Sequence, residues 1–298
     1  DTATTAVVEG QISGLGQLIK QGNGTLSITS AFNNFTGGSL VLAGTLEIST
    51  SSLPGDVNIS GAGFLRFLQN TDGSYSGLIS GAGSVIKDGS GVVTLTAMNT
   101  WNGEANIIQG GLQVDAATLN DNSVDTATNT GLLFNQNSDG SYSGVLSGAG
   151  ALVKFGTAAL TLSNNNTYAG GTFISQGALI VDSDNRLGDI GGAVVFNSGL
   201  LETTADMSMN RDISIGSGGA SILTDASTTL TINGNVTGTG QFIKEGDGHL
   251  VLSNVANSYY GGTLINGGVL RAGNAGALVN NTAYQLNAGL LDLNNYNL

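Results

Sequence analysis

Short stretches of alternating apolar and polar residues recur along the whole chain. Residues 25–30, 93–97, 159–163 and 230–236 alternate with a period of two, and glycines or asparagines separate them from their neighbours. A period of two places one set of side chains inside a sheet and the other set outside. We therefore predict short strands joined by tight turns. No stretch has a convincing helical period, and the closest, residues 116–123, is predicted to be a loop.

Three motifs recur four times each in one register. The first is Gly-x-Gly-x, two apolar residues and a lysine, and it ends at Lys20, Lys87, Lys154 and Lys244. The second is Asn-x-aromatic-x-Gly, and it begins at Asn33, Asn99, Asn166 and Asn257. The third is Gly-x-Leu, and it begins at Gly44, Gly110, Gly177 and Gly268. The steps between the lysines are 67, 67 and 90 residues. A fixed period of this kind is typical of solenoid architectures.

A submultiple of about 22 residues divides these steps and predicts one coil of an all-β parallel β-helix, a β-solenoid. Each coil would hydrogen-bond to the next about 4.8 Å along the axis, so no coil is stable alone. We expect Leu26, Leu160 and Leu250 to point inward, with Val93 as the equivalent in the second copy. We also expect four glycines to share one corner, three coils apart for the first three: Gly14, Gly81, Gly148 and Gly238.

The repeat spacing also predicts the domain organisation. We expect a single β-helix over residues 1–298, and the fourth, longer interval places an extra coil within residues 200–236. The predicted repeat units are roughly 12–62, 63–130, 131–198 and 199–288, with the start of a further unit at 289–298. Because the chain begins and stops in repeat phase, we expect it to be a fragment of a longer molecule.

Composition narrows the classes of partner. Only 10% of the residues are charged, and the net charge is −13. Eight lysine and arginine residues cannot form the basic stripe that neutralises phosphates, so we expect no nucleic-acid partner. Attraction to anionic lipid is not expected for the same reason. The chain has no cysteine, which excludes thiolate chemistry and disulfide bonds.

Few residues offer catalytic or metal-binding chemistry. His249 is the single histidine, and its strand position predicts an ordinary exposed side chain. The closest local group of carboxylates is Asp182 and Asp184 with Arg186, which we interpret as a loop at a coil corner. We therefore expect no catalytic residue, no metal site, no cofactor and no enzymatic activity. Carboxylates distant in sequence could still converge on one face, which leaves a carbohydrate-active β-helix enzyme as an alternative.

The repeated polar and aromatic residues can be structural or can bind a partner. We expect the motif lysines to satisfy corner carbonyls or to pair with a carboxylate on an adjacent coil, and the motif asparagines to act as turn or ladder amides. Aromatic side chains either pack over glycine corners or stack on sugars and protein surfaces. The candidate partner or glycan contacts are Tyr75, Tyr142, Trp101, Tyr168, Tyr259 and Tyr260.

Together the three motifs resemble the passenger-associated transport repeat of Gram-negative autotransporters, also called the autotransporter-associated β-strand repeat. Residues 148–179 and 238–270 match its pattern well, and residues 14–46 and 81–112 match it more loosely. The resemblance implies a right-handed parallel β-helix passenger. It also implies secretion through a C-terminal outer-membrane β-barrel of the same precursor, and a place on the cell surface or outside the cell.

For function, the resemblance implies adhesion or self-association, as in cell aggregation, biofilm formation and virulence. The expected partner is another copy of the chain, or host-cell or matrix glycans or proteins. Rows of uncharged polar side chains would supply many weak bonds, and their number would supply the affinity. Besides the enzyme, one more alternative stays open, which is a structural stalk that promotes secretion and carries another functional part.

Overall fold

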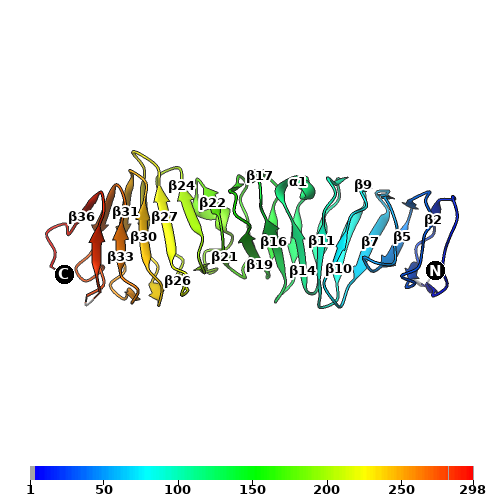
Figure 1. The fold of residues 1–298 in the computed structure, drawn as a ribbon, viewed down its shortest axis with the longest axis horizontal. Helices are drawn as coiled ribbons and strands as arrows, with labels where there is room; N and C mark the ends of the chain where they lie inside the picture. Colours follow the sequence, from blue (N-terminus) through cyan, green and yellow to red (C-terminus); the bar gives the residue numbers. More distant parts are fainter. Residues whose placement is uncertain (1–3, 281, 298) are drawn as a thin grey trace. The chain divides into compact units, whose positions relative to one another are not determined.

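The computed structural model describes residues 4–280 and 282–297, which are almost entirely parallel β-structure (Figure 1). The fold is a β-solenoid of about 14 turns, with about 20 residues per turn. The chain divides into two compact units, residues 1–133 with 144–150 and residues 134–143 with 151–298. Leu298, the last residue of the predicted further unit, and the first three residues lie outside the described part of the chain.

Unit 1 has three faces of parallel strands. The first face is an eight-stranded sheet of β1 (Thr5–Val8), β3 (Thr25–Ile28), β5 (Gly44–Ile48), β7 (Gly63–Leu68), β10 (Ser84–Asp88), β13 (Ala105–Ile107), β15 (Val124–Thr126) and β18 (Leu146–Gly148). The second is a five-stranded sheet of β2 (Leu18–Lys20), β4 (Ser39–Val41), β6 (Val57–Ile59), β9 (Ile79–Gly81) and β12 (Thr100–Trp101). The third contains β8 (Gly73–Tyr75), β11 (Val92–Leu95) and β14 (Gly111–Val114). The unit boundary in the sequence falls inside β16 (Gly131–Asn135).

Unit 2 repeats this arrangement. One face contains β19 (Ala151–Phe155), β21 (Thr172–Ile174), β23 (Val194–Phe196), β26 (Ile213–Ile215), β29 (Val236–Gly238) and β32 (Ser258–Tyr259). An eight-stranded face is made of β17 (Gly140–Tyr142), β20 (Leu160–Leu162), β22 (Ala178–Val181), β24 (Leu200–Thr203), β27 (Ala220–Thr224), β30 (Phe242–Glu245), β33 (Thr263–Ile265) and β35 (Tyr284–Leu286). A five-stranded face is made of β25 (Met207–Met209), β28 (Thr229–Ile232), β31 (His249–Leu252), β34 (Val269–Ala272) and β36 (Leu290–Asp292).

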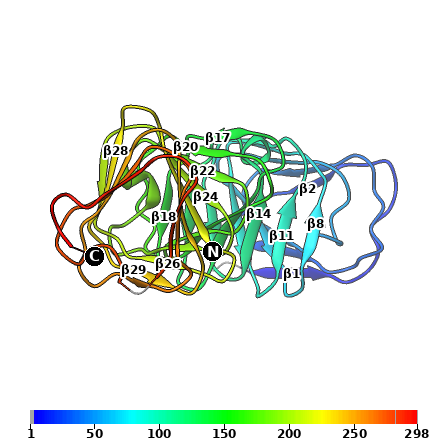
Figure 2. The ribbon, with the colours of Figure 1, turned by 60° about the vertical axis from the view of Figure 1, so that its left-hand side comes forward.

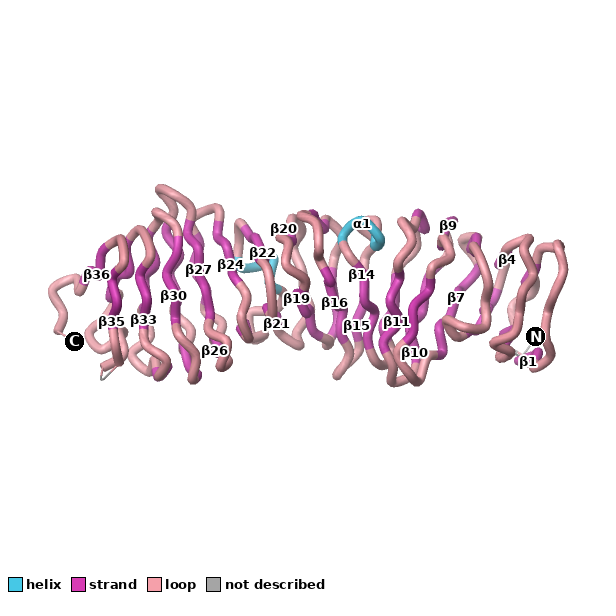
Figure 3. The backbone as a smooth tube through the Cα atoms, viewed as in Figure 1, coloured by secondary structure: helices cyan, strands magenta, loops and turns pink. Residues whose placement is uncertain are grey.

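Within the described part of the chain, two short helices interrupt the strands (Figure 3). The first, α1 (Ala116–Leu119), corrects the prediction of a loop at residues 116–123. The Asp115 side chain accepts a hydrogen bond from the Thr118 amide, and the Thr118 hydroxyl accepts one from the Asp115 amide. This capping box stabilises one helical turn, which is too short to produce a helical period in the sequence. The second, η1 (Asp184–Leu187), is a 3₁₀ turn. None of the described helices is long and apolar enough to cross a membrane.

The period-two pattern places the core as predicted. Leu160, Leu250 and Val93 are fully buried, and the residues that alternate with them face outward. Leu26 points to the same interior but is only half-buried, because it lies at the first described turns of unit 1. Burying an aliphatic side chain of this size contributes about 1.5–3 kcal/mol, and the stacking of such residues from turn to turn supplies the core of each unit.

The length of a turn differs from the prediction, and this changes how the repeats are placed. Lys20 pairs in register with Val41, then Ile59, then Gly81, so three turns take 61 residues. Lys87 lies six residues beyond Gly81, in a strand of another face. One 67-residue repeat is therefore three turns plus one further strand. The predicted coil of 22 residues is too long because it assumed a whole number of coils per repeat.

The repeated glycines consequently do not share one corner. Gly81 lies in β9 of the five-stranded face of unit 1, whereas Gly148 lies in β18 of the eight-stranded face. Gly14 lies in a bend, and Gly238 ends β29 in unit 2. Each repeat therefore begins one face later than the repeat before it within unit 1. In unit 2, the residues paired in register from Lys154 to Gly238 span four turns and 84 residues. The equivalent series in unit 1, from Lys20 to Gly81, spans one turn fewer.

Candidate functional site

The motif lysines point inward, and each binds three backbone carbonyls. The Lys87 Nζ donates to the carbonyl oxygens of Asp88, Gly89 and Gln109 at 3.0, 2.8 and 3.1 Å. Lys154 makes the equivalent bonds to Phe155, Gly156 and Gln176. Lys20 and Lys244 repeat the pattern. The third carbonyl belongs to the next turn, so each ammonium joins two turns at a glycine corner. This confirms the prediction that the lysines satisfy corner carbonyls.

These lysines are not available to a ligand. Lys87, Lys154 and Lys244 are each at most 1% exposed, and the three carbonyls use all three N–H donors. Burial lowers the pKa of Lys154 to about 8, and burial likewise lowers the pKa of Lys244 to about 8. The direction follows because removal from water disfavours the charged ammonium.

Three of the motif asparagines, Asn33, Asn99 and Asn257, join three turns each. The Asn99 Oδ1 accepts a hydrogen bond from the Ile79 amide one turn earlier, and its Nδ2 donates to the Thr118 carbonyl one turn later. Asn33 and Asn257 make the same pair of bonds to their preceding and following turns. Asn166 donates to a carbonyl of its following turn. These bonds confirm the prediction of ladder amides.

Five of the six aromatic residues predicted as partner or glycan contacts are buried, so that prediction is wrong for them. Trp101, Tyr168 and Tyr259 have no exposed surface, and Tyr75 and Tyr142 are at most 2% exposed. Only the sixth, Tyr260, is exposed, at 76%.

Two of these aromatic rings lie inside the solenoid because a glycine occupies the paired position one turn earlier. Trp101 pairs with Gly81, and Tyr259 pairs with Gly238, one turn earlier. A Cβ on either glycine would lie 2.1 Å from a carbonyl oxygen of the turn before. Both glycines also have a positive φ, which disfavours other residues. A glycine leaves space in the interior, and the aromatic ring of the next turn packs against that position.

The buried tyrosines have a hydroxyl partner that the first two repeats lack. The Tyr168 Oη lies 2.6 Å from the Thr172 Oγ1, and the Tyr259 Oη lies 2.9 Å from the Thr263 Oγ1. The first repeat has Phe35 with Ser39 instead, and the second has Trp101 with Ala105. Within the described residues, the Ser39 Oγ and the Trp101 Nε1 are buried without a hydrogen-bond partner.

Replacing Phe35 with tyrosine should therefore stabilise the protein. The new hydroxyl would reach Ser39, as Tyr168 reaches Thr172, and a net hydrogen bond contributes about 0.5–1.5 kcal/mol. We expect Phe35→Tyr to raise the free energy of unfolding in urea by about 1 kcal/mol. In the double variant Phe35→Tyr/Ser39→Ala this gain should disappear. A destabilised Phe35→Tyr protein would show that the first repeat does not share the geometry of the third.

Charged groups near the 3₁₀ turn are bound to each other. Asp182 pairs with Arg186 at 2.7 Å, and a hydrogen bond from Arg186 holds the pKa of Asp182 below its ordinary value. Asp184 pairs with Arg211 at 2.7 Å. The buried Arg211 also donates to backbone carbonyls of this loop, those of Asp184, Leu187, Gly188, Asp189 and Gly192. The group is therefore a corner loop held by arginine. The sequence does not point to Arg211, because this residue lies outside every motif.

Neither His249 nor any group of possible metal ligands forms a catalytic or metal site in the described part of the chain. His249 is exposed at the start of β31, and it pairs in register with Thr229 and Val269. Among residues 4–280 and 282–297, no group of three or more histidine, aspartate or glutamate side chains is arranged to hold a metal ion.

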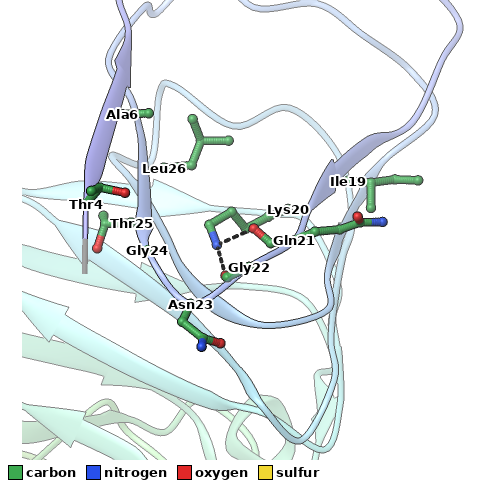
Figure 4. A pocket seen from close by; sticks show the side chains of 10 residues that line it. All are labelled: Thr4, Ala6, Ile19, Lys20, Gln21, Gly22, Asn23, Gly24, Thr25 and Leu26. Carbon is green, nitrogen blue, oxygen red and sulfur yellow. Dashed lines mark hydrogen bonds between the residues drawn. The ribbon is translucent and has the colours of Figure 1, made fainter. Parts of the chain in front are cut away.

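A cavity of about 530 Å³ lies at β1, β2 and β3 (Figure 4). Ala6 and Leu26 line it, and both belong to the inward column that continues through Leu46. The Lys20 Nζ also lies there, bonded to the carbonyls of Gln21 and Gly22. The lining is core surface of the first described turns, and its one cation is already bound, so we place no ligand site in this cavity.

The remaining candidates for recognition are the outward side chains of the sheet faces. On the eight-stranded face of unit 1, Arg66 pairs with both Glu47 and Asp88. On the eight-stranded face of unit 2, a groove of about 540 Å³ runs across several turns.

The sequence profile of the passenger-associated-transport-repeat matches residues 18–48, 85–119, 152–181 and 242–272. The chain contains four passenger-associated transport repeats. Each matched segment contains one motif lysine, one motif asparagine and one motif aromatic residue, all of which are buried except the half-buried Asn33. The pattern of this repeat therefore specifies the internal bonds of the solenoid, and not a binding surface.

A relative supports the same assignment for this passenger region. A segment of the adhesin BmaC autotransporter of Brucella suis biovar 1 (strain 1330) is 30% identical over 355 residues, which covers 93% of this chain. The passenger region spans 10% of the length of that relative. No solved structure matches the chain. The expectation of an autotransporter passenger with these repeats is confirmed.

Proposed function

We propose that this chain is an adhesive region of a passenger exposed on, or released from, the surface of a Gram-negative bacterium. The observation that carries the proposal is the match of nearly the whole chain to a protein named as an adhesin autotransporter. The structure supports it indirectly, because the repeat motifs are buried and only outward side chains can contact a partner. We propose a non-enzymatic role, in agreement with the carboxylates at residues 182–184 being paired with arginines.

Ladders of uncharged side chains supply the mechanism. Along one ladder in unit 2, Asn233 donates to the Asn210 side chain, and Asn254 donates to the Asn233 carbonyl. These three residues, the asparagine ladder, face solvent in successive turns about 4.8 Å apart. A partner with its own row of polar groups can form one weak bond per turn, and many such bonds together give strong attachment. The low charge of the chain keeps repulsion from the partner small.

Display of the chain on a non-adherent Gram-negative strain tests this function. The expected result is attachment to host cells or to matrix-coated surfaces, or clumping of the bacteria, which would indicate self-association. A matched strain should display the same chain after heat unfolding, to show that attachment needs the folded surface. If the chain is displayed and folded but produces neither attachment nor clumping, the proposal is wrong.

A stalk that holds another part of the precursor away from the cell is the second candidate. The observation that favours it is the uniform bonding of the turns, with the same lysine and asparagine contacts recurring in both units. Deleting one 67-residue repeat from the full precursor separates the two functions. Loss of attachment with normal export favours the adhesin, and loss of export with attachment retained favours the stalk.

A further inference from the structure

The groove of about 540 Å³ lies on the outer surface of the eight-stranded face of unit 2. Its lining comes from the strands β20, β22, β24, β27 and β30 and from the turns that precede them, and several of these strands follow one another in Figures 1 and 2. Ala159, Ala178, Leu200 and Leu223 form an apolar floor. The side chains of Ala159 and Ala178 are small, so the surface is depressed above them.

The strand register shows that this floor continues along the face. In one outward row, Ala178 pairs with Leu200, then Ser221, then Ile243 and Leu264. The row is half-buried rather than covered. A neighbouring outward row runs through Ile180, Glu202, Leu223 and Glu245. The half-buried aliphatic side chains on the outer side of this sheet face leave apolar surface that a partner can cover.

Carboxylates accompany the apolar floor, and none of them forms an ion pair with a described residue. Asp139 lines the groove at β17, Glu245 lines it at β30, and Glu202 lies between them in the neighbouring row. Burial, and then the charge of Asp225, raise the pKa of Glu202 above its ordinary value.

The cations of unit 2 are occupied elsewhere. Lys154, Lys244 and Arg211 point inward and are bound to backbone carbonyls. Arg186 pairs with Asp182, and Arg271 pairs with Asp292 on another face. Among the described residues, the outward rows of the eight-stranded face therefore carry carboxylates without an ion-pair partner, and the inward Lys244 interacts with the Glu245 carboxylate only through its charge.

We propose that this groove binds an extended polypeptide segment with aliphatic side chains and a lysine or arginine toward each end. Five steps between turns separate Asp139 from Glu245, or about 24 Å at the usual strand spacing. An extended peptide rises about 3.3 Å per residue, so a segment of about seven residues spans the two carboxylates. The aliphatic side chains would cover Leu200 and Leu223, and the basic side chains would complement the acids.

The chemistry of the groove argues against the two other occupants. A second copy of this chain carries a net charge of −13 and would bring further carboxylates to Glu202 and Glu245. No aromatic side chain is among the residues that line the groove within the described chain, so a sugar ring would have no flat surface on which to stack. The inference names the partner of the adhesive surface, and it rests on the proposed function.

The probe is a synthetic seven-residue peptide, Lys-Val-Thr-Val-Ser-Val-Lys, blocked at both ends and carrying a fluorophore. Fluorescence anisotropy with the full chain should show saturable binding at low ionic strength. The variant Asp139→Asn/Glu245→Gln should weaken this binding about tenfold, because the basic ends lose their complementary charges. The control variant Glu9→Gln/Glu104→Gln removes two exposed carboxylates of unit 1 and has the same net charge, so it should bind within about twofold of the unchanged chain.

Three results would overturn the inference. The peptide could fail to bind, it could bind equally to the unchanged chain and the groove variant, or the control variant could weaken binding as much as the groove variant. If neutral oligosaccharides or a second copy of the chain bind the groove in place of the peptide, the assignment of the occupant is also wrong. The display assay separates this inference from the adhesive function, because adhesion that persists in the groove variant refutes only the groove.

Discussion

Replacing Lys87 with methionine is expected to lower the free energy of unfolding by about 2–4 kcal/mol. Methionine fills the space of the lysine stem but cannot donate to the carbonyls of Asp88, Gly89 and Gln109. The Asp88 carbonyl keeps the bond from the Gln69 amide, so the main loss falls on the other two. A buried polar group without a partner costs about 1–3 kcal/mol. Urea unfolding followed by circular dichroism measures this change.

Lys20→Met is the matched control for this substitution. Lys20 occupies the same motif position and binds three carbonyls, but it lines the open cavity at the first described turns. Water can reach the freed carbonyls there, so we expect a loss below about 1 kcal/mol. If Lys87→Met and Lys20→Met have equal and small effects, the lysines do not hold the turns together.

Leu160→Ala is expected to cost about 2–5 kcal/mol of unfolding free energy, as for other fully buried leucines. Leu160 has no exposed surface and stacks between Gly140 and Leu179 in its column. Its removal would leave a cavity that neighbouring turns, fixed by their hydrogen bonds, cannot close. The same urea titration gives the value, and the slope of the transition should be unchanged.

His249→Ala is the surface control, with an expected change within about 0.5 kcal/mol. The side chain is exposed, and the structure gives it no hydrogen bond or ion pair with another described residue. A large loss of stability or of adhesion on replacing His249 would show that this residue has a structural or binding role. A small loss on replacing Leu160 would mean that the period-two register is wrong.

The fold class could be predicted from the sequence, but the number of residues per turn could not be obtained by dividing the repeat. The division assumes that the 67-residue repeat contains a whole number of coils. The three-faced cross-section instead lets a motif recur after three turns and one further strand. A signal for the true turn was present at Gly24-Thr25-Leu26 and Gly44-Thr45-Leu46, which are 20 residues apart. Thr25 and Thr45 do pair in register.

The roles of the motif residues were only partly predictable. The lysine and asparagine bonds follow from the need to satisfy buried carbonyls and amides at every corner. The sequence left packing over glycine corners and partner contact as alternatives for Trp101 and Tyr259, because sequence spacing does not show that a glycine lies one turn beneath the ring. The groove was missed for a similar reason. Glu202 and Glu245 are 43 residues apart, and only the register places them in one row, with Leu223 between them.

The central claim is that partners contact the outward ladders and not the buried motif residues. The most direct test measures the attachment of chain-coated beads to the surface that the displayed chain binds. We expect Tyr168→Phe/Tyr259→Phe, which removes two buried hydroxyls, to leave attachment unchanged, and Asn210→Ala/Asn233→Ala/Asn254→Ala, which removes the asparagine ladder, to reduce it. Loss of attachment in the tyrosine variant while circular dichroism shows an intact fold, together with normal attachment in the ladder variant, would contradict the claim.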